Sequence, residues 1–156
     1  GYGATADAAH ITLPAPGGAG AVRAARRALA KAGRSGAEID HVNAHATSTP
    51  EGDKAELEAI RTILGPGSSA SVTATKSAIG HTLGAAGGLG SIATISAMRD
   101  GRVHPTLNLT APDPATVGLH IVTGAAAAQQ VRLALVNAFG FGGQNSALLF
   151  ARWEGR

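Results

Sequence analysis

The stretch 42-VNAHATSTPEGDKAE-56 joins two different patterns, and it decides the fold that the rest of the chain follows. The segment 39-IDHVNA-44, which leads into it, is typical of a short strand. From Pro50 onward, acidic residues mark the first turn of a helix, where they complement the exposed N–H groups, and apolar residues then recur at helical spacing up to 65-GPG-67. The sequence therefore predicts a strand, a polar loop and a helix in that order.

The same scheme recurs along the chain and predicts a layered α/β fold. A helix is expected over 19–33 with Gly33 as its stop, and a Gly/Ala-faced helix is expected over 82–101. The remaining predicted segments are a strand at 71–74, a loop at 75–81, short strands at 103–107 and 119–122, and two apolar runs at 131–138 and 145–152. The two apolar runs flank the glycine-rich turn 139-FGFGGQ-144, and they are too apolar for a half-exposed hairpin, so we place both in a buried sheet.

Length and composition suit one globular domain over residues 1–156. The chain contains 22 glycines and only 3% aromatic residues, which favours close backbone packing over a bulky aromatic core. The sequence opens with 1-GYGATADAAH and not with methionine, and we therefore expect it to be part of a longer protein.

Charge and cysteine content exclude several classes of function. The net charge of +3 comes from scattered basic residues, whereas nucleic-acid binding usually needs a concentrated basic face. The chain has no cysteine, so it offers no thiol nucleophile and no thiolate zinc site. No signal peptide and no membrane-spanning apolar run stands out, and we expect a cytoplasmic setting by default.

His45 lies where the first predicted strand ends, and three interpretations compete for it. It can be a core histidine beside a helix cap made by Thr47, Ser48 or Thr49. It can be a metal ligand together with His41, but these positions are not one helical turn apart and no third ligand is suitably spaced. It can also belong to a site shared with Lys76 and His81, which follow the next predicted strand, because ligands collect at the carboxyl ends of strands in α/β sheets.

The glycine-rich turn 139-FGFGG-143 offers backbone N–H groups for an anion. The alternative is a tight turn that buries Phe139 and Phe141, and we favour burial for Phe139. The run 88-GLGSIA-93 matches a dinucleotide fingerprint, but it lies inside the predicted helix, and no suitable acid follows about 20 residues on. We therefore expect no dinucleotide site there.

Three segments, NAHATSTPEGDKAE, TKSAIGHTLGAAG and NAFGFGGQNSALLF, occur in this order. Together they closely resemble the C-terminal half of a β-ketoacyl-acyl-carrier-protein synthase of the type II elongating kind, within the thiolase-like superfamily. The resemblance covers essentially the whole chain. It implies one βαβαβαββ-type half of a five-layer α-β-α-β-α architecture, a homodimer, an acyl carrier protein as partner, and no cofactor apart from the carrier's phosphopantetheine. The half with the nucleophilic cysteine would lie outside this chain.

The resemblance also implies roles for individual residues in a decarboxylative Claisen condensation. His45 and His81 would flank the malonyl group and stabilise its enolate, and Lys76 would orient the second histidine. Thr47 and Thr49 would hydrogen-bond the phosphopantetheine arm. The turn formed by Phe139, Phe141, Gly142 and Gly143 would supply an oxyanion N–H at Phe141, whose ring would gate the site. We expect Asp53 and Glu56 to be helix-start acids with structural partners.

The sequence departs from the family pattern at two positions besides the missing cysteine. Ala46 stands where glycine is usual, and Gly90 stands where a glutamate often pairs with the lysine matching Lys76. An alternative is therefore a non-catalytic, chain-length-factor-like partner subunit. A thiolase or chalcone-synthase relative fits less well, because thiolases normally carry a second cysteine in this half and chalcone synthases an asparagine at the position of His81. Alone, the chain should be inactive and should expose the apolar surface that meets the other half.

Overall fold

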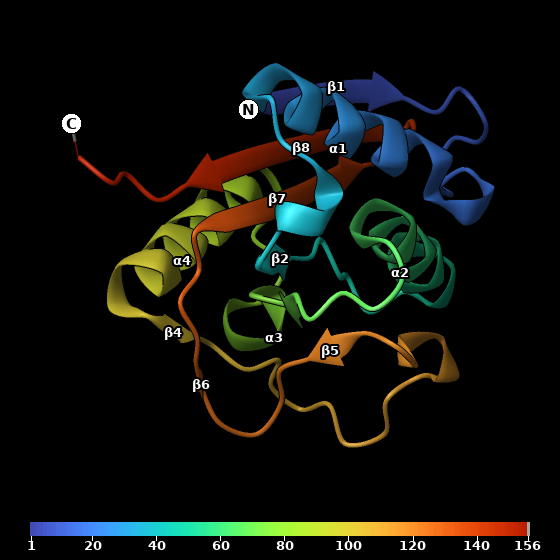
Figure 1. Cartoon of the computed structure of the whole chain (residues 1–156). Coiled ribbons are helices and arrows are strands. Elements are labelled where there is room, and N and C mark those ends of the chain that lie inside the picture. The colour runs from blue at the N-terminus through green and yellow to red at the C-terminus, as the bar shows by residue number, and fades with distance from the viewer. Residues whose placement is uncertain (156) are drawn as a thin grey trace.

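The computed structural model describes residues 1–155, which form a mixed six-stranded sheet with helices on both of its faces and a separate two-stranded sheet (Figure 1). The strands are β1 (Tyr2–Ala6), β2 (His41–Asn43), β3 (Ser71–Thr73), β4 (Arg102–Val103), β5 (His120–Ile121), β6 (Ala127–Ala128), β7 (Leu133–Gly140) and β8 (Gln144–Ala151). The helices are α1 (Ala19–Ala32), α2 (Pro50–Leu64), α3 (Lys76–Ile79) and α4 (Ala86–Asp100). Short 3₁₀ turns link several of these elements.

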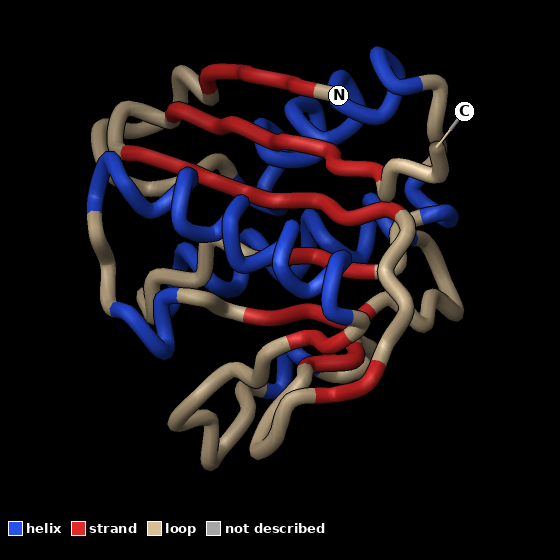
Figure 2. Tube along the Cα trace, turned by 90° about the vertical axis from the view of Figure 1, so that its left-hand side faces the viewer, coloured by secondary structure: helices blue, strands red, loops and turns tan. Residues whose placement is uncertain are grey.

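The main sheet has six strands in the order β1-β8-β7-β2-β3-β5, and Figure 2 shows them stacked side by side. Strands β7, β2, β3 and β5 run parallel, whereas β8 is antiparallel to both of its neighbours. Strands β4 and β6 form a separate antiparallel pair. Because β2, β3 and β7 are parallel, the loops that leave their carboxyl ends meet at one edge of the sheet.

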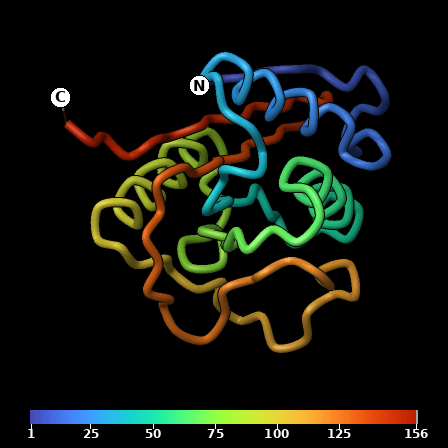
Figure 3. Tube along the Cα trace, in the orientation of Figure 1, coloured from blue at the N-terminus to red at the C-terminus, as the bar shows by residue number. Residues whose placement is uncertain are grey.

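Helices α1 and α2 cover one face of the sheet, and α3 and α4 lie on the other (Figures 1 and 3). The larger core forms between the sheet and the first pair of helices, and its fully buried side chains include Val42, Ile60 and Leu135. A smaller core gathers beneath α4 around Met98 and Val131. In β2 and β3, polar residues alternate with the apolar residues of the larger core, because successive residues of a strand point to opposite faces.

The predicted helices and parallel strands are confirmed, with boundaries within a few residues of those expected. Gly33 ends α1 in the left-handed conformation, with its N–H bonded to the carbonyls of the last turn. The prediction of a loop over 75–81 is wrong in part, because residues 76–79 form the one-turn helix α3. The helix expected over 82–101 begins later, at Ala86, after a 3₁₀ turn.

The C-terminal strands also differ from the prediction. β7 and β8 do form a hairpin, and the turn is shorter than expected because Phe139 and Gly140 belong to β7. β8 alternates between buried and half-buried residues, so only one of its faces is fully covered. The strands expected over 103–107 and 119–122 shrink to the two-residue strands β4 and β5.

The outer face of α4 is apolar and uncovered. Ile92 is 62% exposed and Ile95 49% exposed, and no other part of the described chain lies in front of α4 in Figure 2. A helix that is apolar on both faces normally packs against protein on both. Within residues 1–155, no helix is both long enough and apolar enough to cross a membrane.

Candidate active site

The loops that follow β2, β3 and β7 converge at the carboxyl edge of the sheet. His45 follows β2, Lys76 and His81 follow β3, and Phe139 is the second-last residue of β7. His45 and His81 lie with their ring centroids 5.8 Å apart and their planes at 89°. The structure therefore brings together the residues expected to share a site at this edge, and they come from two crossover loops and the β7–β8 hairpin.

The hydrogen bonds of each ring fix which nitrogen carries its proton. The Nδ1 atom of His45 accepts from the backbone N–H of Phe139 at 3.3 Å and lies 3.3 Å from the Lys76 ammonium, and both of these groups can only donate. The Nδ1 atom of His81 accepts from the backbone N–H of Leu83 at 3.1 Å. In the neutral form of each ring, the proton must therefore be on Nε2, which leaves two N–H donors for a ligand.

Lys76 contacts the first histidine and not the second. Its ammonium group donates to the backbone carbonyl of His45 and lies against that residue's ring. The sequence analysis expected Lys76 to orient His81, whereas the hydrogen bonds of Lys76 in this structure go to His45, on the loop after β2. Burial lowers the pKa of Lys76, while the negative charges of Glu56 and Asp53 act in the opposite direction.

His45 is held in its neutral form. Burial is the largest cause, followed by the charges of Lys76 and His81, and together they lower the pKa of His45 from 6.5 to about 4. At neutral pH the ring is therefore an N–H donor without a charge.

Glu56 holds the backbone of the His45 loop from beneath. Its two carboxylate oxygens accept from the N–H groups of His45 and Ala46, each at 2.8 Å, and from the side chain of Asn137 at 2.9 Å. The side chain is only 4% exposed, and this burial raises its pKa. The expectation that Glu56 is a structural partner is confirmed, and the contact explains how the loop keeps its shape.

Ala46 occupies a strained backbone position. Its φ is 36°, in a region that residues with a side chain rarely adopt and that glycine adopts freely. The methyl group at this position costs roughly 1 kcal/mol. The two N–H bonds to Glu56 supply the contacts that hold the loop in this conformation.

The threonines lie at the rim of the site and do not cap the helix. Thr49 is at the N-cap position of α2, but its side chain makes no capping hydrogen bond, so the capping expected of Thr47, Ser48 or Thr49 is not made there. The hydroxyls of Thr47 and Thr49 lie 3.2 Å apart. Asp53 instead accepts from the N–H of Ser48 at 3.2 Å, and burial raises the pKa of this carboxyl.

The turn after β7 divides into a packed part and an exposed part. The Phe139 ring packs on the core and lies 5.3 Å from the His45 ring, as expected. Phe141 is 79% exposed, so the alternative in which it is buried is wrong. The N–H of Gly142 donates to the carbonyl of Ile11 at 2.6 Å, which leaves that donor engaged within the protein.

Gly143 lies beneath the loop that follows β1, where a side chain would not fit. A Cβ at this position would come within 2.7 Å of the Asp7 Cβ, and the φ of Gly143 is +74°. The N–H of Asp7 donates to the carbonyl of Gly143 at 2.9 Å. The turn therefore needs glycine here both for space and for backbone conformation.

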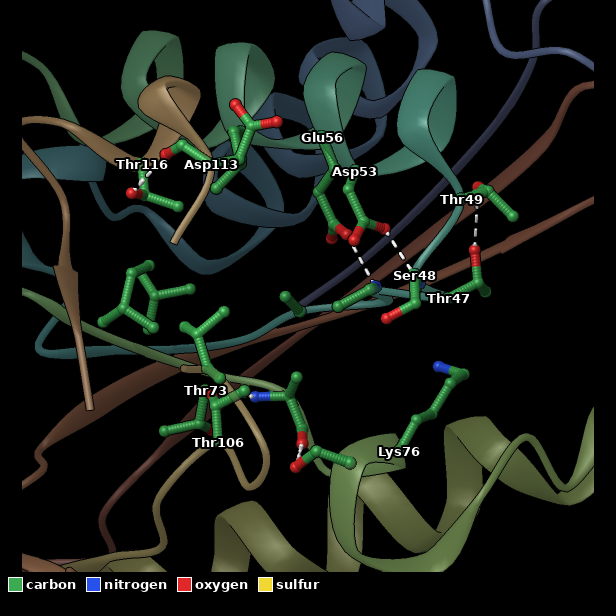
Figure 4. Close-up of a pocket in the computed structure, with 18 of the residues that line it drawn as sticks. Thr47, Ser48, Thr49, Asp53, Glu56, Thr73, Lys76, Thr106, Asp113 and Thr116 are labelled. Atoms are coloured by element: carbon green, nitrogen blue, oxygen red, sulfur yellow. Dashed lines mark hydrogen bonds between the residues drawn. The ribbon is translucent and has the colours of Figure 1, made fainter. Parts of the chain in front are cut away.

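A cavity of about 540 Å³ opens beside these residues (Figure 4). Its walls include the loop of Thr47, Ser48 and Thr49, the side chain of Lys76 and the ring of His81, and it continues between α2 and the segment 106–116. Figure 4 shows Asp53 and Glu56 on one wall of the cavity and Lys76 on the opposite wall. Among residues 1–155, no three His, Asp or Glu side chains lie close enough together to hold a metal ion.

The sequence matches the family of the β-ketoacyl synthase C-terminal domain over residues 1–110, and the chain belongs to this family. It is 45% identical over 150 residues to the chloroplastic 3-oxoacyl-[acyl-carrier-protein] synthase II of Arabidopsis thaliana, covering 96% of this chain and 28% of that protein. The chain spans roughly a third of the length of the curated relatives it matches.

Two solved structures place the fold among the ketosynthases, which are thiolase-like. The ishigamide ketosynthase/chain length factor aligns with a TM-score of 0.91 at 38% identity, covering 98% of this chain and 37% of that one. A type II polyketide synthase acyl-carrier protein in complex with its ketosynthase, bound to a hexaketide, aligns with a TM-score of 0.91 at 30% identity, covering 99% of this chain and 38% of that one. The thiolase-like fold expected from the sequence is confirmed by these structures.

Sequence analysis missed the buried amides that link the loops. Asn43 and Asn137 each precede an alanine just before a functional loop, in 43-NAH-45 and 137-NAF-139. Both are buried, and each hydrogen-bonds a residue of the site's framework. The repeated Asn-Ala pair shortly before a loop is the signal that could have identified them.

Proposed function

We propose that the chain is the C-terminal part of a 3-oxoacyl-acyl-carrier-protein synthase and supplies the residues that stabilise the enolate in a decarboxylative Claisen condensation. The single observation that carries this proposal is the pair of facing imidazoles, His45 and His81, each with its Nδ1 already engaged and its Nε2–H free for a substrate oxygen. The similarity to proteins named 3-oxoacyl-acyl-carrier-protein synthase supports it.

The reaction divides between this chain and the part that lies outside it. In the malonyl thioester, the bond between the methylene carbon and the carboxylate breaks, carbon dioxide leaves, and the electron pair passes into the enolate. The enolate carbon then attacks the acyl thioester carried by a cysteine outside this chain, and the cysteine thiolate leaves. Negative charge develops on the thioester oxygen of malonyl, and two preorganised N–H donors stabilise it more in the transition state than in the ground state.

The residues at the rim of the site are suited to bind the phosphopantetheine arm of a substrate. The paired hydroxyls of Thr47 and Thr49 can hydrogen-bond the amide groups of that arm, and the exposed ring of Phe141 can close over it. Under this proposal no cofactor is needed, because the substrate arrives on an acyl carrier protein. A cytoplasmic location is also part of the proposal. The Arabidopsis relative, in contrast, is chloroplastic.

The uncovered face of α4 supports a larger assembly. Exposed apolar side chains follow this helix and continue onto the segment before it, and they are Ile79, Leu83, Leu89, Ile92 and Ile95. We propose that the N-terminal half of the synthase packs here as the next layer, and that the completed protein forms a homodimer. The isolated chain, which lacks the nucleophile, would then be inactive.

A partner subunit of the chain-length-factor kind is the second candidate, because one structural neighbour is a ketosynthase/chain length factor. The presence of His45, Lys76 and His81 together favours the catalytic alternative, since a subunit without chemistry has no need for both donors. The residue in the upstream nucleophile loop distinguishes the two: cysteine supports the enzyme, and glutamine or another substitute supports the partner.

The test is to co-express the upstream half with this chain and measure decarboxylation of malonyl-acyl-carrier protein. His45→Ala and His81→Ala should each lower the rate about 100- to 1,000-fold, because each removes one donor from the developing oxyanion. His120→Ala is the matched control, since His120 is an exposed histidine on β5, outside the loops that carry His45 and His81. Undiminished activity in both site variants would refute the proposal.

A further inference from the structure

Asn43 makes an unusually dense set of contacts at the end of β2. Its side-chain nitrogen, which carries two hydrogens, lies within hydrogen-bond distance of three acceptors: Thr75 Oγ1 at 2.7 Å, the carbonyl of Gly90 at 3.1 Å and Thr94 Oγ1 at 3.1 Å. Its side-chain oxygen accepts from Thr75 Oγ1 at 3.1 Å. Asn43 is only 2% exposed, so these partners replace water completely.

The partners of Asn43 lie on the segments that carry the second half of the site. Thr75 is the residue directly before Lys76, and Gly90 and Thr94 lie on α4, which follows His81. Asn43 itself is two residues before His45. One buried amide thus ties together three segments that are far apart in the sequence.

Backbone pairing alone cannot set the relation between these loops. The pairing of β2 with β3 ends at Asn43 and Thr73, and the backbone bond that follows it runs from Ala44 N–H to Thr73 O at 2.8 Å. Beyond it, side chains must hold the loops together. A buried amide serves this purpose because leaving its polar groups unpaired there would cost free energy. This cost restricts the two loops to positions in which the hydrogen bonds are made.

We propose that Asn43 is a positioning residue, which sets the distance between His45 on one loop and Lys76 and His81 on the other through its paired hydrogen bonds with Thr75. The effect of Asn43 on catalysis rests on the function proposed above. The effect of Asn43 on the position of the loops does not depend on that function, and it can be measured on the 156-residue chain without any substrate.

Two variants and one control test this role. Thr75→Val keeps the size of the side chain and removes the hydroxyl that Asn43 binds, and Asn43→Ala removes the amide. Thr75 Oγ1 also lies 3.1 Å from His104 Nε2, so the bond between Asn43 and Thr75 is the feature that the two variants lose in common. Thr94→Val is the matched control, because it removes a partner on α4 and leaves the bonds from Asn43 to Thr75 and Gly90 in place.

The first readout is the pKa of the His45 ring, measured by NMR titration of the chain. Burial, Lys76 and His81 together lower this pKa to about 4. If the loops separate, water enters and the lysine moves away, so Thr75→Val and Asn43→Ala should raise the pKa toward its ordinary value of 6.5. Thr94→Val should leave it unchanged.

The second readout is steady-state kinetics of the synthase assembled with its upstream half. Misplaced donors should lower kcat about 10- to 100-fold with little change in KM, because substrate contacts at the rim are retained. If folded Thr75→Val and Asn43→Ala keep the wild-type pKa of His45, or if Thr94→Val changes it as much as they do, the proposal is wrong. Should Asn43→Ala fail to fold, Thr75→Val alone decides. Loss of the proposed function would instead appear as full activity of His45→Ala.

Discussion

His41 provides a quantitative test of the buried polar network beneath the site. The ring is fully buried, with Nδ1 2.9 Å from Ser71 Oγ and Nε2 3.4 Å from Thr73 Oγ1. Burial is the main cause that lowers the pKa of His41 to about 4, and the charge of His104 adds to it. A hydrogen bond with the backbone of Ser71 acts in the opposite direction, but it is a smaller cause than burial and the charge of His104.

The sign of the resulting pH dependence follows from where the proton binds. The pKa of His41 has its ordinary value of 6.5 in the unfolded chain and is about 4 in the folded chain. The unfolded state therefore binds more protons between these values, so the stabilisation is fully present above pH 6.5 and is lost as the pH falls toward 4. Lowering the pH from 7 to 5 should therefore reduce the free energy of unfolding by about 2 kcal/mol through His41 alone.

Urea unfolding at pH 7 and pH 5 measures this loss. The variant His41→Gln should lose about 2 kcal/mol less than the wild type between the two pH values, because it has no buried ring to protonate. Other groups that titrate in the same range, including His45 and Glu56, are present in both proteins and cancel in the difference. His120→Gln should behave as the wild type does.

Equal losses in the wild type and in His41→Gln would refute the reasoning. If the variant does not fold, NMR titration of the His41 ring in the wild type gives the same answer, and a pKa near 6.5 would contradict it.

Further predictions concern stability and association. Glu56→Ala leaves one buried and two part-buried donors without their acceptor. It should lower the free energy of unfolding by about 3 kcal/mol in urea titrations, and an unchanged value would contradict the loop-holding role. Ala46→Gly relieves a φ of 36° and should raise stability by roughly 1 kcal/mol, seen as a higher Tm. Gly143→Ala places a methyl group 2.7 Å from the Asp7 Cβ and should cost about 1–3 kcal/mol by the same measurement. Ile92→Lys should reduce concentration-dependent association in light scattering, and unchanged association would mean that another surface is responsible.

Local signals were enough to predict the helices and the parallel strands. Gly33 and the pair Gly65-Pro66 end helices wherever the chain folds, because they act through backbone conformation. β1 was not predicted, since it is an edge strand whose partner β8 lies about 140 residues away in the sequence. Its outward carbonyls at Ala4 and Ala6 are bonded by arginines of α1, a contact that no local pattern indicates.

The site was predictable to the level of which loops meet, but not of which side chains touch. Parallel strands bring their carboxyl ends together, and this rule places His45 near His81 from the sequence alone. The partner of Lys76 depends on α3, a single turn whose direction follows from its tertiary contacts. The role of Asn43 depends on α4 packing over β2, which becomes visible only in three dimensions.

Burial, and after it the positive charge of Lys76, keeps the His45 ring neutral, and a neutral ring suits the proposed chemistry. An imidazolium is an acid strong enough to give its proton to an enolate, which would end the reaction as an acetyl thioester before any carbon–carbon bond formed. A neutral imidazole holds its remaining N–H far more tightly, so it can donate a hydrogen bond to the enolate oxygen without losing the proton. Lys76 and the Phe139 N–H both direct donors at Nδ1 of His45, and the carboxylate of Glu56 accepts from the loop backbone. The arrangement therefore stabilises charge on a substrate oxygen while leaving the reactive carbon free to attack.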